Sequence, residues 1–211
     1  MCHETFALEN ELQGSRLRLR LTRLLAICIL VVFGAGASFW SIDQAVAGKC
    51  LFLAGIALAG FGAAGRSWAT SYISGRKSKQ LVTAGPYSLC RNPLYFFSLV
   101  LGVGIGFCTE TFTMPLVILV ALLILTYVQI KREEPRLLSI FGEQYELYVK
   151  QVPRLFPSFR NYTELDEITI SPRLLKRGFF GIAFLLILIG LLELLQAFHV
   201  ARLLPVYFKI Y

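Results

Sequence analysis

Five long apolar runs, separated by polar and basic stretches, dominate the pattern along this chain. They cover roughly residues 24–40, 50–64, 95–108, 114–130 and 178–198. A helix needs about 20 residues to cross a hydrocarbon core about 30 Å thick, so the three middle runs are short for spans. They still cross if flanking side chains snorkel or the bilayer thins, and the short connections 41–49 and 109–113 predict two tight hairpins. The pattern predicts an all-α, polytopic integral membrane protein with about five transmembrane helices.

The runs divide the chain into four parts. These are a basic arm at 1–23, a membrane body at 24–157, a polar linker at 158–177, and a fifth span with a C-terminal tail at 178–211. The first run follows a long polar and basic stretch, and no small-x-small cleavage site ends it before Trp40. We therefore interpret it as a span and not as a signal peptide.

Basic residues gather on one side of the predicted membrane body. Of the 21 Lys and Arg residues, 18 lie in the segments 1–23, 66–93 and 131–177. Because cytoplasmic loops carry the excess of Lys and Arg, we expect the N-terminus and a helical cap formed by both loops to face the cytoplasm. The C-terminus then lies on the opposite side.

Composition narrows the class of protein further. The chain is 56% hydrophobic and only 16% charged, so it has too few charged side chains to cover the surface of a soluble protein. The net charge of +8 reflects orientation and attraction to anionic lipid, and no basic face stands clear of the membrane for nucleic acid. The five Cys include no CxxC pair and only two His are present, so we expect neither a zinc site nor a disulfide framework.

The segment Leu81–Tyr95 holds more Gly, Pro, Asn and Arg residues than a short loop between membrane helices needs. Gly85-Pro86 predicts a turn, and Asn92-Pro93 predicts a second turn or the first position of a helix. A helix that begins near Pro93 leaves free N–H groups facing the cytoplasm, which together with Arg91 suit a carboxylate or phosphate. A capped helix that simply enters the membrane explains the same residues.

The second dense segment is Lys131–Tyr148, which continues to Val152-Pro153. Glu133 and Glu134 come directly after a membrane span. They either pair with Lys131 or Arg136 on a solvated face, or they bind a cation, orient a substrate or accept a proton. Apolar side chains recur downstream at helical spacing and predict an amphipathic stripe that lies on the bilayer, covers a site, or packs on the helices. The stripe comprises Leu137, Leu138, Phe141, Tyr145 and Tyr148.

Together the two segments resemble the isoprenylcysteine carboxyl methyltransferase family and its relatives, the membrane phospholipid methyltransferases. Leu81, Val82, Gly85, Tyr87, Arg91, Asn92, Pro93 and Tyr95 match the first motif of that family. Glu133, Glu134, Leu138, Phe141, Gly142, Tyr145, Tyr148, Val152 and Pro153 match the second. The order, the separation and the intervening helical hairpin also match, over about residues 50–157.

The resemblance implies a methyltransferase that uses S-adenosylmethionine and a lipid-borne acceptor. The donor would sit in a pocket that faces the cytoplasm, and the acceptor's tail would reach in from the membrane. The His and Cys content separately predicts no metal. The resemblance places Glu133, Glu134 and Arg132 at the catalytic end. The donor pocket that it implies is lined by Lys79, Gln80, Leu81, Val82, Tyr87, Arg91, Asn92, Pro93, Leu94 and Tyr95. A sulfonium is drawn to carboxylates and aromatic faces, and methyl transfer gains most from alignment and exclusion of water.

Two positions depart from the family pattern. Asn92 stands where the family has a histidine, and an amide forms hydrogen bonds but does not exchange a proton near pH 7. Gln129 stands where the carboxyl methyltransferases have an arginine, so a bidentate grip on an acceptor carboxylate is lost. The acceptor is then either a prenylcysteine carboxylate or a lipid headgroup amine or hydroxyl.

Two other functions fit the same chain. One is a membrane reductase that uses NADPH on a sterol or another lipid, since such reductases need no Gly-x-Gly-x-x-Gly fingerprint. The other is a non-catalytic membrane homologue, which Asn92 and Gln129 would suit.

Overall fold

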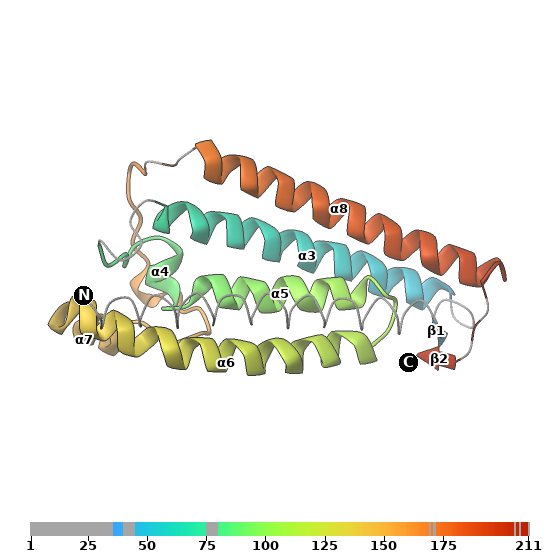
Figure 1. Ribbon diagram of the computed structural model, residues 1–211, viewed down its shortest axis with the longest axis horizontal. Coiled ribbons are helices and arrows are strands. Elements are labelled where there is room, and N and C mark those ends of the chain that lie inside the picture. The colour runs from blue at the N-terminus through green and yellow to red at the C-terminus, as the bar shows by residue number, and fades with distance from the viewer. Residues whose placement is uncertain are drawn as a thin grey trace, which may run out of the picture.

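In the described part of the chain, four long helices lie side by side in the order α8, α3, α5, α6 (Figure 1). The computed structural model describes residues 36–39, 45–74, 80–168, 170, 172–204, 206 and 208–210. The long helices are α3 (Ala45–Ile73), α5 (Pro93–Phe107), α6 (Thr113–Phe141) and α8 (Pro172–Val200). The short elements are α4 (Pro86–Leu89), α7 (Glu143–Gln151), the 3-10 helix η1 (Phe159–Asn161), and strands β1 (Gly36–Ser38) and β2 (Phe208–Ile210).

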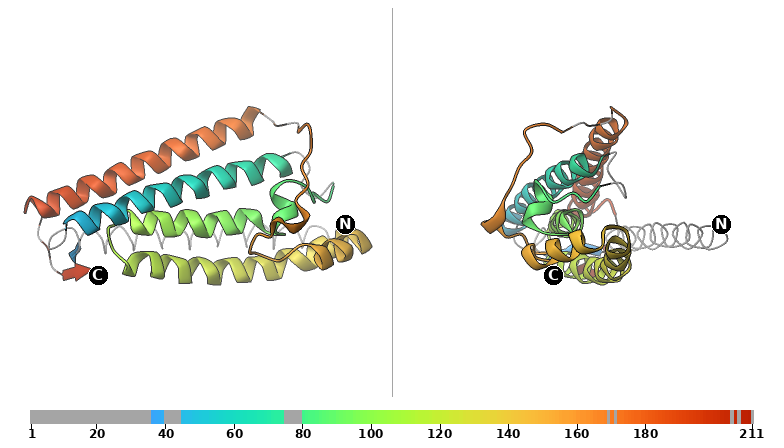
Figure 2. Two further views of the ribbon diagram at one scale, coloured as in Figure 1. Left: turned by 180° about the vertical axis from the view of Figure 1, so that it is seen from behind. Right: turned by 90° about the vertical axis from the view of Figure 1, so that its left-hand side faces the viewer.

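The body has two different ends. The motif end holds α4, α7 and η1, together with the segments 80–95 and 131–165 (Figures 1 and 2). The strand end holds β1, β2, the 108–112 loop, the start of α3 and the end of α8. The predicted helix start at Pro93 is confirmed, and so is the tight α5–α6 hairpin. The two motif segments therefore lie at one end of the body, because one hairpin leaves that end and returns to it.

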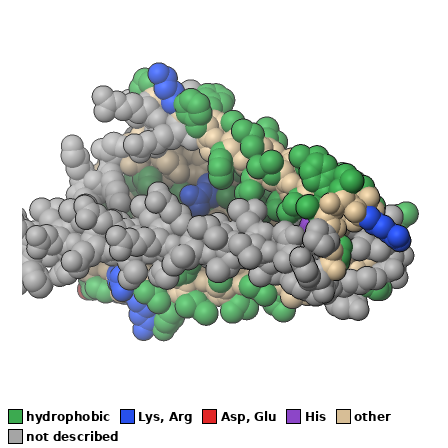
Figure 3. Space-filling model, turned by 45° about the vertical axis from the view of Figure 1, so that its right-hand side comes forward, with side chains coloured by type: hydrophobic (Ala, Val, Ile, Leu, Met, Phe, Trp, Pro, Cys, Tyr) green, Lys and Arg blue, Asp and Glu red, His purple; other side chains and the backbone are tan. Residues whose placement is uncertain are grey.

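Within the part of the chain that the structure describes, three helices are long and apolar enough to cross a membrane. They are Val46–Ile73, Thr113–Phe141 and Gly178–Val200, and the shorter apolar helix Pro93–Phe107 lies between two of them. On the face shown in Figure 3, hydrophobic side chains cover most of the described surface, while Lys and Arg lie mostly toward the ends. Exposed apolar side chains on a membrane-length helix suit contact with lipid. The predicted all-α membrane class is confirmed.

The predicted spans need three corrections of length. The helices α3 and α6 have 29 residues each, whereas the apolar runs 50–64 and 114–130 predicted short spans. At 1.5 Å per residue, 29 residues reach about 43 Å. Both helices continue beyond the apolar run into polar sequence, which a hydropathy pattern does not count as span. The helix α8 likewise begins at Pro172, inside the predicted linker, because proline is well tolerated in a first turn.

The end of the first apolar run is also corrected. Most of the predicted span 24–40 lies outside the described residues, but Gly36–Ser38 is a strand and not a helix. It pairs in parallel with Phe208–Ile210, with Ala37 opposite Lys209. A pairing partner about 170 residues away in sequence is a tertiary feature that no local pattern contains.

Small residues let α3 and α5 approach backbone to backbone. A Cβ placed on Gly104 of α5 would lie 2.3 Å from the amide nitrogen of Ala59 on α3. A Cβ on Gly62 of α3 would lie 2.5 Å from the amide nitrogen of Leu101. Helices in membranes associate through such close contacts, because lipid is as apolar as a leucine side chain. The glycines therefore hold α5 tightly at the centre of the body.

Residues 153–165 are more than the predicted linker. Backbone hydrogen bonds run from Arg91 N to Pro153 O (2.8 Å), from Ser158 N to Leu89 O (2.9 Å), and from Gly85 N to Thr163 O (2.7 Å). We call residues 153–165 the strap. It is bonded along the first motif segment because both run beside α4, where their backbone groups need partners.

Candidate functional site at the motif end

The two motif segments are in direct contact. The hydroxyl of Tyr148 donates a hydrogen bond to the carbonyl of Tyr87 at 2.6 Å. The side-chain nitrogen Nδ2 of Asn92 donates a hydrogen bond to the backbone carbonyl oxygen of Arg154 at 2.9 Å. The predicted turn at Gly85 is present with φ 61°, and a Cβ there would lie 2.4 Å from the Tyr72 ring. Residues that are about 60 positions apart in the chain thus form one site.

One carboxylate organises the charges of this site. Glu134 Oε1 lies 3.1 Å from Arg91 Nη1 in an ion pair. The same oxygen accepts a hydrogen bond from Arg154 Nε at 3.1 Å, and Oε2 accepts one from Arg154 Nη2 at 2.5 Å. The side chains of Arg91 and Glu134 are only 13% and 18% exposed. Two guanidinium groups around one carboxylate leave a net charge of about +1 in a half-buried place, which suits an anionic ligand group.

Glu133 faces different partners from its neighbour. Its Oε1 accepts a hydrogen bond from Gln129 Nε2 at 2.9 Å, one helical turn earlier on α6. Burial and the nearby Glu133 carboxylate raise the pKa of Tyr87 well above its ordinary value. Glu133 therefore lies close enough to Tyr87 to raise the pKa of its hydroxyl. Successive positions on a helix point about 100° apart, which explains why the two glutamates divide their roles.

Aromatic side chains cover the junction between the segments. Tyr145, Tyr148 and Val152 are buried together, and Leu81, Leu137 and Phe141 pack against them. Burial also raises the pKa of Tyr145, an effect that Arg91 opposes. Of the three predicted arrangements of the amphipathic stripe, packing on the helices applies to its tyrosines, which are buried. Leu138 instead is exposed.

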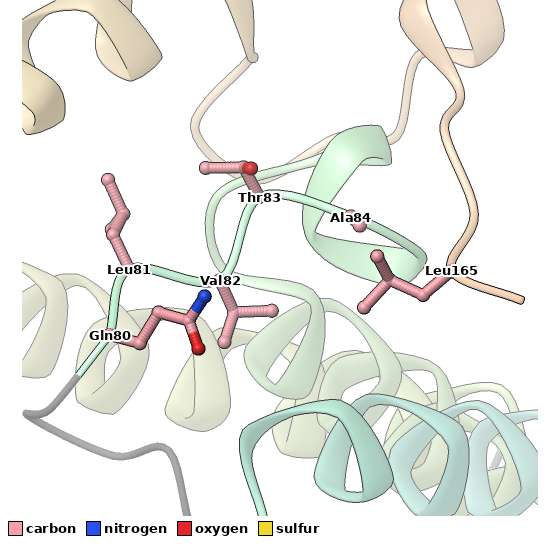
Figure 4. Close-up of a pocket in the computed structure, with 6 residues that line it drawn as sticks. All are labelled: Gln80, Leu81, Val82, Thr83, Ala84 and Leu165. Carbon is pink, nitrogen blue, oxygen red and sulfur yellow. The ribbon is translucent and has the colours of Figure 1, made fainter. Parts of the chain in front are cut away.

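A shallow hollow opens beside the first segment (Figure 4). It has a volume of about 80 Å³ and is lined by Gln80, Leu81, Val82, Thr83, Ala84 and Leu165. In Figure 4 the side chains of Val82 and Leu165 point toward each other across it, while that of Leu81 turns away. Ligand pockets usually enclose about 300–1,000 Å³, so this hollow forms at most one edge of a cofactor site.

The remaining predicted residues divide into three groups. Pro93, Leu94 and Tyr95 form the first turn of α5, which has no side-chain cap because Asn92 bonds to the strap instead. Arg132 is exposed on α6 and pairs with none of the described residues. Lys79 lies outside the described residues.

Arg154 was missed by the sequence prediction. It stands inside the second motif segment, next to Pro153, but only the folded strap brings it to Glu134. A basic residue directly after the Val152-Pro153 match was the available signal.

One buried cysteine, Cys90, lies next to Arg91 in the first motif segment. Burial raises the pKa of the Cys90 thiol to about 11, so it stays protonated near neutral pH. Among the described residues, no three His, Cys, Asp or Glu side chains lie together as a ready-made metal centre.

The sequence profile of the phospholipid methyltransferase family matches residues 22–144, which include most of both motif segments. The chain belongs to this family. The family is part of the isoprenylcysteine carboxyl methyltransferase-like superfamily, so the resemblance seen in the sequence is confirmed. The family supports a membrane methyltransferase.

Two curated relatives are named for metal resistance. The nickel-cobalt-cadmium resistance protein NccN of Alcaligenes xylosoxydans xylosoxydans is 35% identical over 68% of this chain, and the match covers 66% of NccN. The cobalt-zinc-cadmium resistance protein CzcN of Cupriavidus metallidurans is 32% identical over 92% of this chain and 87% of CzcN. The chain thus spans just under two thirds of NccN but most of CzcN. No solved structure matches it significantly.

Proposed function

We propose that the motif end transfers a methyl group from S-adenosylmethionine to a lipid-borne acceptor. The observation that carries this proposal is the meeting of both family motifs at one charged, half-buried site, through the Arg91–Glu134 ion pair and the Tyr148–Tyr87 hydrogen bond. S-adenosylmethionine, when bound, supplies an activated methyl group on a positively charged sulfur.

The residues at this end fit such a donor. The net positive charge around Glu134 and the first turn of α5, which no side chain caps, suit the donor's carboxylate. Val82, which lines the hollow in Figure 4, and Tyr87 of the same segment would contact its less polar parts. Arg91 and Asn92 would fix its position, since each is held by the strap.

Glu133 would act on the acceptor. Gln129 holds Oε1 of Glu133, which leaves Oε2 to take the proton from an attacking amine or hydroxyl. An acceptor carboxylate has no arginine at position 129 to hold it, so a headgroup amine or hydroxyl fits better than a prenylcysteine carboxylate. The acceptor's tail would remain in the bilayer, because Glu133 lies at the end of a membrane-length helix.

Binding and labelling experiments test this proposal. We expect S-adenosylmethionine and its demethylated product, and not NADPH, to raise the melting temperature of the purified protein in detergent. We also expect radiolabelled donor to label a lipid when the protein is incubated with membranes. Stabilisation by NADPH alone would favour the reductase instead, and binding of neither compound would favour a non-catalytic homologue.

We also propose that the motif end faces the cytoplasm, on the strength of the excess of Lys and Arg there. The test uses single cysteines at two exposed positions, Ser139→Cys at the motif end and Ala201→Cys at the strand end. All natural cysteines are replaced by serine. In intact cells, a membrane-impermeant maleimide should label only the variant at position 201. Labelling of only position 139 would reverse the orientation.

We further infer that this methyl transfer serves tolerance to metal ions. The support is the naming of both curated relatives, one of which matches along most of its length. Deletion of the gene from its host should lower growth in cobalt, zinc or cadmium, and a Glu133→Gln copy should not restore it. Full rescue by that copy would separate metal tolerance from methyl transfer.

A further inference from the structure

Two hydrogen-bond donors at the motif end are buried without an acceptor. They are the hydroxyl of Tyr145 and the guanidinium nitrogen Nε of Arg91, and neither atom has a hydrogen-bond partner among the described residues. Tyr145 is only 3% exposed, so water does not replace the missing acceptor easily. A buried donor without an acceptor is costly, and the two atoms therefore favour a ligand that accepts hydrogen bonds.

The two donors belong to one place in the fold. Tyr145 is buried together with Val152, and the backbone N–H of Arg91 donates to the carbonyl of Pro153, the next residue, at 2.8 Å. Burial raises the pKa of Tyr145 and the Arg91 guanidinium opposes that rise, so the two side chains are close. Because arginine only donates hydrogen bonds, even contact between the two side chains leaves the hydroxyl proton without an acceptor.

The charge around the two donors selects an anion. The Arg91 guanidinium uses Nη1 for Glu134, at 3.1 Å, while its Nε is not used by any described residue. Arg154 pairs with the same carboxylate, so the group of three side chains keeps positive charge. Charged acceptors form the strongest hydrogen bonds with a guanidinium, so a carboxylate or a phosphate fits best.

Leu81 connects the two donors with the hollow beside the first motif segment. It lines the hollow, but its side chain turns away from it (Figure 4) and packs against the cluster that contains Tyr145. The hollow and this cluster thus border the same side chain. A ligand that moves Leu81 would extend the hollow toward Tyr145, and this would enlarge a hollow that is too small for a cofactor as it stands.

We propose that Arg91 Nε and the Tyr145 hydroxyl bind the carboxylate of S-adenosylmethionine between them. The inference rests on the proposed methyl transfer and adds Tyr145 to the residues that hold the donor. The donor's carboxylate is favoured over a lipid phosphate because Arg91 belongs to the first motif segment, which also lines the hollow. The test distinguishes these two sources of an anionic group.

Calorimetric titration of the purified full chain in detergent tests the proposal with S-adenosylmethionine and its decarboxylated form, which lacks only the carboxylate. Tyr145→Phe keeps the buried ring and removes the hydroxyl. We expect this variant to bind S-adenosylmethionine about tenfold more weakly than the parent, as for the loss of one charge-assisted hydrogen bond. It should bind the decarboxylated form as the parent does. Tyr127→Phe, at an exposed position on α6, is the matched control and should bind both compounds as the parent does.

Melting curves without ligand give a second readout. Tyr145→Phe should melt at the temperature of the parent or above it, because its hydroxyl has no partner in the described part of the chain. Tyr148→Phe should melt lower, because it loses a hydrogen bond to the Tyr87 carbonyl. Equal melting of the two variants below the parent would show that the Tyr145 hydroxyl is already bonded in the free protein, and would overturn the proposal.

The failure of this inference is distinguishable from the failure of the proposed function. If Tyr145→Phe binds S-adenosylmethionine as the parent does, or loses equal affinity for both compounds, the carboxylate is not bound there and methyl transfer still stands. Unchanged donor affinity with weaker labelling of lipid would assign the two donors to a lipid phosphate instead. If the parent binds neither compound, the proposed function fails and this inference fails with it.

Discussion

The two ends of the helix body hold ion clusters of opposite design. At the motif end one carboxylate, Glu134, lies between the guanidinium groups of Arg91 and Arg154. At the strand end one ammonium, Lys49, lies between two carboxylates. The first arrangement leaves positive charge and the second negative charge. At the motif end, the excess of positive charge favours an anionic ligand group.

The clusters also differ in how fully their hydrogen bonds are satisfied. Both oxygens of Glu134 have partners, and Arg154 grips them through two nitrogen atoms. At the strand end, Oε2 of Glu110 and Oε2 of Glu193 are buried without a partner among the described residues. The paired carboxylate fixes Arg91 and Arg154 relative to α6, as catalysis by alignment requires, whereas the strand end keeps unsatisfied carboxylate oxygens among the described residues.

The largest effect at the motif end is expected for Glu133→Gln. We expect methyl transfer to a lipid extract to fall by roughly 10²–10⁴-fold, the usual contribution of a general base, while donor binding stays nearly unchanged. Labelled-donor turnover and a donor titration measure the two quantities. Glu143→Gln, an exposed glutamate on α7, is the matched control. Normal turnover in Glu133→Gln would remove this residue from its role.

Glu134→Gln tests the rigidity of the motif end. Two guanidinium groups would lose their shared carboxylate, so we expect a lower melting temperature and a loss of turnover of about 10²-fold from misplacement of Arg91. Thermal unfolding in detergent and labelled-donor turnover provide the readouts. Glu146→Gln, exposed on α7, should change neither. If Glu134→Gln behaves like this control, the ion cluster does not order the site.

Gly104→Ala tests the body that connects the two ends. The added Cβ would lie 2.3 Å from the backbone of α3, so we expect a loss of about 1–3 kcal/mol of stability from overpacking. Denaturation in detergent measures it. Gly60→Ala on α3 meets nothing within 4 Å and should be neutral or stabilising. Equal stability of the two variants would show that α3 and α5 are not in close contact.

The smallest effect is expected for Tyr148→Phe. It removes the 2.6 Å hydrogen bond to Tyr87 and should cost about 1 kcal/mol of stability. Burial raises the pKa of Tyr148 in the folded state, so above pH about 10 the unfolded chain releases a proton that the folded chain keeps. Stability therefore falls as pH rises through that range.

The pH series has its own control. The Tyr148→Phe variant should lose less stability between pH 9 and pH 11 than the parent, while Tyr127→Phe, at an exposed position on α6, should follow the parent. Parallel curves for all three proteins would mean that Tyr148 is not buried as the structure has it.

Much of the motif end could be read from local sequence. Pro93 begins α5 and Gly85 turns the chain because a fixed φ and a missing Cβ act locally. The pairing of Glu134 with Arg154 and of Glu133 with Gln129 could not be predicted, because lysine and arginine neighbours in sequence offered equally good partners. The strap decides the first pairing, and the helical repeat of α6 decides the second.

Sequence alone determined the membrane class, the helix positions and the family, because apolar runs, prolines and motif residues act within a few positions of themselves. Tertiary structure decided how far α3 and α6 extend, that Gly36–Ser38 is a strand, and which charges meet at each end. Those features depend on contacts between residues that are distant in the chain. Lys49 and Glu193 are 144 positions apart, and only the packing of α8 against α3 brings them together.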